Sequence, residues 1–106
     1  MQTSALPPRR REVDASTGPL VLEFGTAWCG YCRRAQPLIA NALRAHPQVQ
    51  HVRVEDGPGQ VLGRSFGVKL WPTLVFLQDG RETTRLVRPD SPEALQRAFG
   101  DITRPS

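Results

Sequence analysis

The fold is decided by one stretch of the sequence, Leu20-Val21-Leu22-Glu23-Phe24-Gly25-Thr26-Ala27-Trp28-Cys29-Gly30-Tyr31-Cys32. It starts with a run of large apolar side chains, which is typical of a buried strand. The apolar residues beyond it recur with helical spacing, so a helix is expected to begin at Cys29 or Gly30. That stripe consists of Ala35, Leu38, Ile39, Ala42 and Leu43. Two cysteines therefore stand where a buried strand passes into a helix.

Two prolines shape this helix. Pro37 lies inside it and removes one backbone hydrogen bond, so we expect a kink there. His46-Pro47 ends the helix, because the residue before a proline is disfavoured in the helical region.

The rest of the chain predicts three more strands and two more helices. They are a strand over 49–54, a helix over 58–66, a strand over 73–77, a strand over 81–87 and a helix from Ser91 to Gly100. Asp79-Gly80 predicts a tight hairpin between the last two strands. We expect the first three strands to run parallel, since helices connect them, and the fourth to run antiparallel to the third. The fold class is α/β, with one mixed four-stranded sheet flanked by helices in the order β-α-β-α-β-β-α.

The length of 106 residues allows one domain. Residues 1–19 hold three prolines and the run Arg9-Arg10-Arg11 but few apolar groups, so we expect a flexible N-terminal tail. The domain then covers residues 20–100, and residues 101–106 form a short C-terminal tail.

The formal net charge of +4 comes from 14 basic residues, of which only Lys69 is a lysine. Arginine suits phosphate contacts, but these arginines are scattered and lack interleaved aromatic residues, so we expect no nucleic-acid partner. No apolar run approaches the roughly 20 residues that cross a bilayer, so no membrane partner is expected either. The arginine run lacks the apolar segment of an export signal, which predicts a cytoplasmic location, or a periplasmic one for a processed form. We expect a monomer.

The two cysteines form a Cys-x-x-Cys pair at a helix start. The helix dipole and the unpaired N–H groups there favour the thiolate of Cys29. Cys32 lies one turn further in and would be the resolving thiol. The alternative is a pair of small, buried apolar residues without chemistry.

A zinc site is an alternative interpretation of the two cysteines. The spacing Cys29-x2-Cys32-x13-His46-x4-His51 satisfies a zinc-finger pattern. A finger of this kind needs both histidines on one helix face, whereas Pro47 separates them here. We therefore expect no metal, with His46 at a helix end and His51 an ordinary strand residue.

From about residue 13 to residue 99, the chain resembles the thioredoxin family. The resemblance rests on several features: Glu23 at the position of the family's buried acid, Trp28-Cys29-Gly30-Tyr31-Cys32 in place of its W-C-G-P-C motif, the kinking Pro37, Trp71-Pro72-Thr73 in place of its cis-proline and threonine, and the hairpin Asp79-Gly80.

The resemblance implies a thiol–disulfide oxidoreductase. Cys29 would attack a substrate disulfide, and Cys32 would then resolve the mixed disulfide. Glu23 would take the proton of Cys32 as a general base, with its pKa raised towards neutrality by burial. The alternative for Glu23 is a solvent-facing edge residue. No cofactor is implied beyond the Cys29–Cys32 disulfide.

The resemblance also implies a substrate-binding surface. Pro72 would be cis and would bring its loop against the two sulfurs. Trp71 would offer its backbone N–H and C=O to an extended peptide, unless it is simply a core residue. Trp28 would form an apolar rim with Trp71. The other residues of this surface would be Gly30, Tyr31, Thr73 and Arg88.

Four features depart from the family. Tyr31 replaces the motif's proline, as in isomerase-type relatives of the oxidising periplasm, and Glu23 replaces an aspartate. The family's N-terminal strand and helix would be shortened or absent. Arg88 stands where thioredoxins carry a glycine, and it would narrow the groove or select acidic partners.

The expected function is the reduction of protein disulfides, with a reductase or another electron donor as the second partner. Two alternatives remain open. One is a disulfide isomerase or oxidase if the chain is exported, and the other is a thioredoxin-fold adaptor that binds partners without redox turnover.

Overall fold

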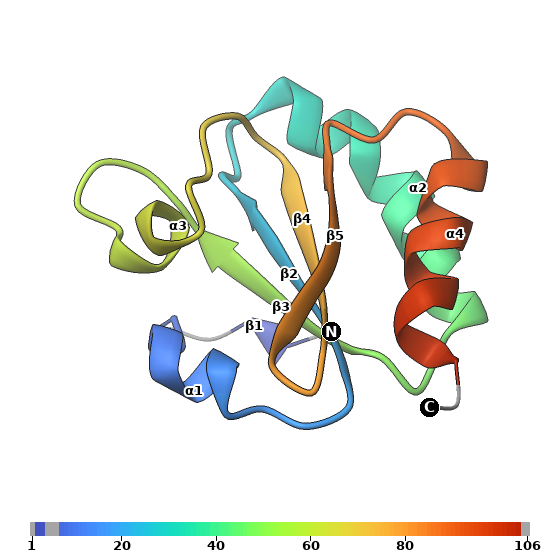
Figure 1. Ribbon diagram of the computed structural model, residues 1–106. Coiled ribbons are helices and arrows are strands. Elements are labelled where there is room, and N and C mark those ends of the chain that lie inside the picture. The colour runs from blue at the N-terminus through green and yellow to red at the C-terminus, as the bar shows by residue number, and fades with distance from the viewer. Residues whose placement is uncertain (1, 4–6, 105–106) are drawn as a thin grey trace.

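The computed structural model describes residues 2–3 and 7–104, which form a mixed sheet with helices on both faces (Figure 1). In chain order the elements are β1 (Gln2–Thr3), α1 (Arg10–Asp14), β2 (Pro19–Gly25), α2 (Gly30–Ala45), β3 (Gln50–Glu55), α3 (Val61–Ser65), β4 (Thr73–Gln78), β5 (Arg81–Val87) and α4 (Pro92–Thr103). The strands lie in the order β1-β3-β2-β4-β5, so β2 is central.

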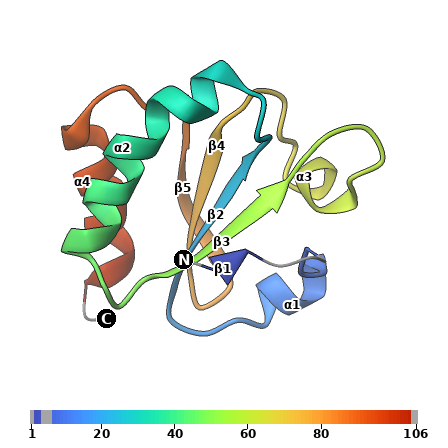
Figure 2. The ribbon, with the colours of Figure 1, turned by 180° about the vertical axis from the view of Figure 1, so that it is seen from behind.

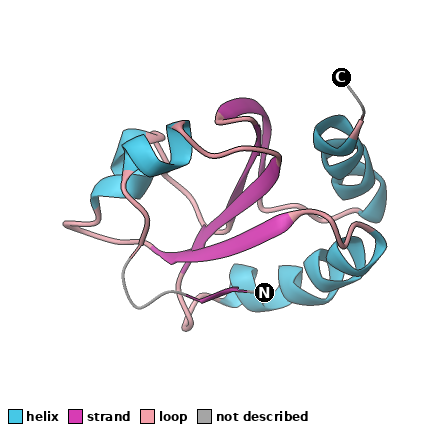
Figure 3. Cartoon of the chain, turned by 90° about the horizontal axis from the view of Figure 1, so that it is seen from below, coloured by secondary structure: helices cyan, strands magenta, loops and turns pink. Residues whose placement is uncertain are grey.

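The side chains of β2 point alternately into two apolar cores, one on each face of the sheet. Helices α2 and α4 cover one face of the sheet, and α1 and α3 cover the other (Figures 1 and 2). Leu22 and Phe24 belong to the core under α1 and α3, whereas Val21 belongs to the core under α2 and α4. The view from below shows the twisted sheet between these helical layers (Figure 3). The apolar stripe expected on α2 faces the core under α2 and α4, where Ala35 and Ile39 are buried.

The prediction of three parallel strands is wrong for β4. β2 and β3 run parallel, but β4 runs antiparallel to β2. The expected helix between β3 and β4 has only five residues, Val61–Ser65. At about 1.5 Å per residue it is far too short to carry the chain back along a six-residue strand. The connection therefore stays at one end of the sheet, and β4 re-enters from that end. β5 then returns antiparallel to β4, as expected.

Residues 10–14 were expected to belong to an unstructured tail, and that prediction is wrong. They form α1, which is anchored because Val13 is buried in the core under α1 and α3. Arg10 also donates a hydrogen bond to the Ser65 carbonyl oxygen at 2.8 Å, and its guanidinium lies 3.8 Å from the ring of Phe66. β1 pairs with β3, so the N-terminal strand is shortened rather than absent and the sheet has a fifth strand. The part of the expected tail at residues 1 and 4–6 lies outside the described residues.

The C-terminal boundary also differs from the expectation. Gly100 does not end α4, which continues to Thr103 because Ile102 is fully buried against the sheet. The Thr103 hydroxyl donates to the Phe99 carbonyl oxygen at 3.0 Å and keeps the last turn closed. The expected tail at residues 101–106 therefore begins as helix, and its residues 105–106 lie outside the described part. Within the described ranges, no helix has the length and apolar character needed to cross a membrane.

Candidate active site

The two cysteines lie in the first turn of α2. Cys29 is the N-cap of this helix, and the backbone N–H of Cys32 donates to its sulfur at 3.3 Å. Both side chains are buried and both are free thiols. The helix that was expected from Cys29 or Gly30 thus places its unpaired N–H groups against the sulfur of Cys29.

The surroundings shift the pKa values of the two thiols in opposite directions. Burial opposes ionisation of Cys29, but hydrogen bonds from Cys32 and from the backbone of Tyr31, together with the charge of Arg88, hold its pKa below the ordinary value. Burial, together with the neighbouring Cys29 and Glu23, raises the pKa of Cys32 to about 11. Cys29 is therefore the more acidic thiol of the pair, and Cys32 keeps its proton at neutral pH.

The Trp71–Pro72 peptide bond is cis, as the resemblance implied. It brings the loop before β4 against the start of α2, where the Cys29 thiol donates to the Trp71 carbonyl oxygen at 3.8 Å. Thr73 is buried, and its hydroxyl donates to the Leu70 carbonyl oxygen at 2.6 Å. Its side chain thus supports the loop and is not on the substrate-binding surface, which corrects the expectation for this residue.

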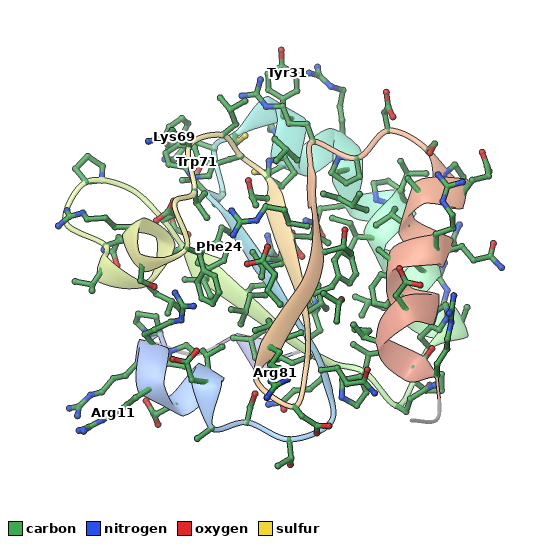
Figure 4. The ribbon with its side chains drawn as sticks, viewed as in Figure 1. Arg11, Phe24, Tyr31, Lys69, Trp71 and Arg81 are labelled. Carbon is green, nitrogen blue, oxygen red and sulfur yellow. The ribbon has the colours of Figure 1, made fainter. Side chains whose placement is uncertain are left out.

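An aromatic rim surrounds the cysteines. Trp28 is 71% exposed, and its ring meets that of Trp71 edge to face at 5.6 Å. Trp71 is half-buried, and its indole N–H donates to the carboxylate of Asp56 at 2.9 Å, so it is an edge residue and not a core residue. Tyr31 and Trp71 lie at the same end of the molecule, near the sulfur atoms (Figure 4). Gly30 is exposed between the cysteines.

Arg88 joins this rim from the end of β5. Its Nε donates to the Trp71 carbonyl oxygen at 2.9 Å, and its guanidinium lies 3.7 Å from the centre of the Tyr31 ring. Its backbone φ is +51°, a left-handed conformation that favours glycine. The structure therefore brings together Cys29, Trp71 and Arg88, which are distant in the sequence.

Glu23 is fully buried on the face of the sheet below α2. The imidazole of His51 donates to its carboxylate at 2.7 Å, and the amide of Gln36 donates to the other oxygen. The Arg53 guanidinium lies 3.9 Å away. Glu23 is thus a member of a buried polar network and not a solvent-facing edge residue.

Glu23 and Cys32 line one cavity of about 220 Å³. That volume exceeds the roughly 30 Å³ share of a single water molecule, so the cavity has room for water beside both groups. Gly25 also lines the cavity, and a Cβ atom at this position would lie 2.7 Å from the Cys32 sulfur. The glycine therefore leaves room for the resolving thiol.

The pKa of Glu23 was expected to rise, and that prediction is wrong. Burial does raise it, but the hydrogen bond and charge of His51, the hydrogen bond of Gln36 and the charge of Arg53 together outweigh burial. The pKa of Glu23 consequently lies below 4.5. The carboxylate is ionised at neutral pH, but such a group is a weak base towards Cys32, whose pKa is about 11, so Glu23 can relay the proton of Cys32 and does not hold it.

Sequence reasoning missed His51 and Gln36 as parts of this site. The signal for His51 was the alternation of its strand, which puts it on the same face as Val49, the face that packs against α2. Gln36 lies one helical turn beyond Cys32, on a similar face of α2.

The zinc-finger spacing does not correspond to a site. His46 stacks on Phe99 with ring centres 5.2 Å apart, and its Nδ1 lies 3.0 Å from the Ala42 carbonyl oxygen. His51 is bound to Glu23. Across residues 2–3 and 7–104, no group of three or more His, Cys, Asp or Glu side chains is arranged to hold a metal ion.

Several known proteins that this chain resembles are thioredoxins. The sequence model of the family described as Thioredoxin matches residues 9–100. Thioredoxin 2 from Pseudomonas aeruginosa PAO1, solved in its reduced form, is 55% identical with a TM-score of 0.84, over 96% of this chain and 94% of that one.

Plant thioredoxins are more distant relatives. Thioredoxin H5 of Oryza sativa subsp. japonica is 33% identical over 81% of this chain and 63% of its own length. Thioredoxin H-type 1 of Nicotiana tabacum is 31% identical over 73% of this chain and 61% of its own length. The chain thus spans about three fifths of these two relatives. Because the family model covers most of the chain and the motif, the cis-proline and the fold agree with it, the chain belongs to the thioredoxin family.

Proposed function

We propose that this chain reduces protein disulfides through a Cys29–Cys32 dithiol. The observation that carries the proposal is the asymmetry of the two thiols. The N-cap position and the charge of Arg88 favour the thiolate of Cys29, while burial raises the pKa of Cys32 to about 11. A nucleophile and a resolving thiol therefore stand next to each other, beside a cis-proline loop.

The first step forms a mixed disulfide. The Cys29 thiolate attacks one sulfur of the substrate disulfide, a new S–S bond forms, and the second substrate sulfur leaves as a thiolate that takes a proton from water. Trp28 and Trp71, whose rings are in contact, form the apolar rim beside this bond.

The second step releases the substrate. The proton of Cys32 passes through the shared cavity to solvent, with the Glu23 carboxylate as a relay, and the Cys32 thiolate attacks the sulfur of Cys29. The remaining substrate sulfur leaves as a thiolate and the Cys29–Cys32 disulfide forms, so two electrons pass to the substrate. The cysteine pair carries these electrons itself, and a dithiol of a reductase must return them.

Insulin reduction tests the two roles of the cysteines. Cys29→Ser is expected to abolish turnover, because the nucleophile is lost, whereas Cys32→Ser is expected to accumulate a mixed disulfide with the substrate. The trapped species is measured by mass spectrometry under non-reducing conditions. Turnover by Cys29→Ser equal to that of the unchanged protein would exclude the catalytic role and would leave the adaptor function.

The reduction potential of the pair sets the direction of electron flow. A value near −270 mV is expected for a reductant, and a value between about −120 and −180 mV would identify an oxidant or isomerase. The second direction is supported by one observation, the charge of Arg88 beside Cys29. Stabilisation of the reduced form makes a cysteine pair more oxidising.

A further inference from the structure

The side chain of Arg88 lies across the surface that presents Cys29. Its Nε donates to the Trp71 carbonyl oxygen at 2.9 Å, and its backbone N–H donates to the Pro72 carbonyl oxygen at 2.8 Å. The guanidinium also lies 3.7 Å from the centre of the Tyr31 ring. These contacts fix Arg88 between the cis-proline loop and the Cys-x-x-Cys turn.

The carbonyl group that Arg88 occupies is the one that an extended substrate would use. The Trp71 oxygen lies 3.8 Å from the Cys29 sulfur, so a peptide whose cysteine reaches that sulfur runs past this oxygen. A backbone N–H of the peptide pairs with such a carbonyl as a strand pairs with its neighbour. Arg88 Nε donates to this oxygen at 2.9 Å, and its guanidinium is held between the oxygen and the Tyr31 ring, where the N–H of such a peptide would approach. The side chain of Arg88 therefore lies in the path of the substrate strand, which displaces it on binding.

A displaced Arg88 is a free cation beside the reacting sulfur. In the described part of the chain no carboxylate lies within 4.0 Å of its guanidinium. Arg34 lies 4.6 Å from the same Tyr31 ring, so a second guanidinium adds positive charge here. A hollow of about 360 Å³ opens between Tyr31 and these two arginines, and Asp90, which forms no ion pair with either of them, also lines it. Guanidinium groups bind carboxylates through two parallel hydrogen bonds, which water and neutral side chains do not match.

We propose that Arg88 gates the substrate strand and selects disulfides with an acidic residue beside the reacting cysteine. The inference rests on the proposed disulfide reduction. On binding, Arg88 gives up the Trp71 oxygen to the backbone of the substrate and transfers its hydrogen bonds to the substrate's aspartate or glutamate. A substrate with a neutral residue at this position displaces Arg88 but offers it no carboxylate to bind. A substrate with a lysine at this position is repelled by the positive charge of Arg88.

Three peptide disulfides that differ only in the residue before the cysteine test this gate. They carry Glu, Gln or Lys at that position. The reduced protein is mixed with each peptide at low ionic strength, and the second-order rate of mixed-disulfide formation is followed by the fluorescence of Trp28 and Trp71. The unchanged protein is expected to react about tenfold faster with the Glu peptide than with the Lys peptide, the effect of roughly one charge-assisted hydrogen bond. The ratio should fall as salt is added.

Arg88→Gly and Arg34→Gln form the matched pair of variants. Glycine accepts the left-handed backbone at position 88, so Arg88→Gly keeps the fold, and its thermal midpoint verifies this. In Arg88→Gly the Glu-to-Lys ratio is expected to fall below about twofold, since only the more distant Arg34 remains. Arg34→Gln, which leaves the Trp71 oxygen occupied, is expected to retain most of the preference.

The outcomes separate this inference from the proposed function. An unchanged protein that reduces all three peptides equally, or an Arg88→Gly variant that keeps the full preference, would overturn the gate and leave disulfide reduction intact. Failure of the unchanged protein to reduce any of the peptides, or insulin, would overturn both.

Discussion

The thiols of Cys29 and Cys32 lie in one turn of α2, yet their environments differ in three ways that add up. Cys29 accepts the Cys32 N–H, stands at the positive end of the helix and has Arg88 nearby. Cys32 lies deeper, next to the carboxylate of Glu23, and burial raises its pKa to about 11. An ionised Cys29 also raises the pKa of Cys32, because the negative charge on one sulfur opposes ionisation of the other.

Alkylation of the reduced protein should therefore be strongly selective. At pH 7, iodoacetamide is expected to modify Cys29 well before Cys32, because the thiolate is the nucleophile. The rate for Cys29 should rise with pH through a midpoint below 9.0, whereas Cys32 should respond only near pH 11. Mass spectrometry of the singly labelled protein locates the label. Equal labelling of the two cysteines at pH 7 would contradict the assignment.

Arg88→Gly is the matched control for this titration. Removal of the cation should move the midpoint of Cys29 upwards, towards 9.0, because the charge of Arg88 lowers the pKa of Cys29. A midpoint that does not move would remove Arg88 from the electrostatics of the thiolate.

The sequence predicts some of these residue properties and not others. The thiolate of Cys29 follows from its place at a helix start, which local pattern reveals. The direction of the Glu23 pKa does not, because it depends on His51, which lies 28 residues away in the chain and meets Glu23 only across the β2–β3 pair. Burial alone predicts a raised pKa, and only the partners reverse it.

At the scale of elements, local pattern predicts β2, α2 and the hairpin well, because apolar spacing and turn residues determine them. The directions of the strands and the packing of the short helices are harder to predict from the sequence. The antiparallel course of β4 results from the shortness of α3, and a helical pattern does not predict its length closely. α1 forms where little apolar sequence exists, because a single residue, Val13, enters the core.

The close approach of α1 to the β4–β5 hairpin depends on Gly80. A Cβ atom at this position would clash with the backbone carbonyl of Asp14, and Gly80 also has a φ of +80°. Gly80→Ala is therefore expected to lower the free energy of unfolding by about 2–3 kcal/mol, the sum of backbone strain and lost docking. Urea unfolding measures the loss.

Gly67→Ala is the control for the backbone term alone. Gly67 has a similar φ of +67°, but a Cβ atom there meets nothing within 4 Å. Its replacement should cost only about 1 kcal/mol, the strain of a left-handed residue. An equal loss in both variants would show that the contact between Gly80 and Asp14 contributes nothing to stability.

At the scale of the whole molecule, the Glu23 network ties together elements from three parts of the chain. Glu23 lies in β2, His51 and Arg53 in β3, and Gln36 in α2. The network lies on the sheet face whose other residues form the apolar core under α2 and α4. A buried carboxylate is stable there only with its partners, so the global stability becomes coupled to the protonation of one group.

The sign of this coupling follows from the lowered pKa of Glu23. Between its pKa in the folded protein and about 4.5, the unfolded chain binds a proton that the folded protein does not. The network's contribution to stability is therefore fully present above pH 4.5 and is lost as the pH falls through the folded value. Glu23→Gln removes the titrating group, so the free energy of unfolding should fall by about 2 kcal/mol at pH 7 and depend less on pH below 4.5.

Urea unfolding of the reduced protein between pH 3 and pH 7 measures both effects. Glu55→Gln provides the matched control, because Glu55 ends β3 with an exposed side chain and the change of atoms is the same. The control is expected to keep the stability at pH 7 and the acid slope of the unchanged protein. If Glu23→Gln kept that slope as well, some carboxylate other than Glu23 would have to supply the acid sensitivity. The network would then hold β2, β3 and α2 together by hydrogen bonds that do not need the charge.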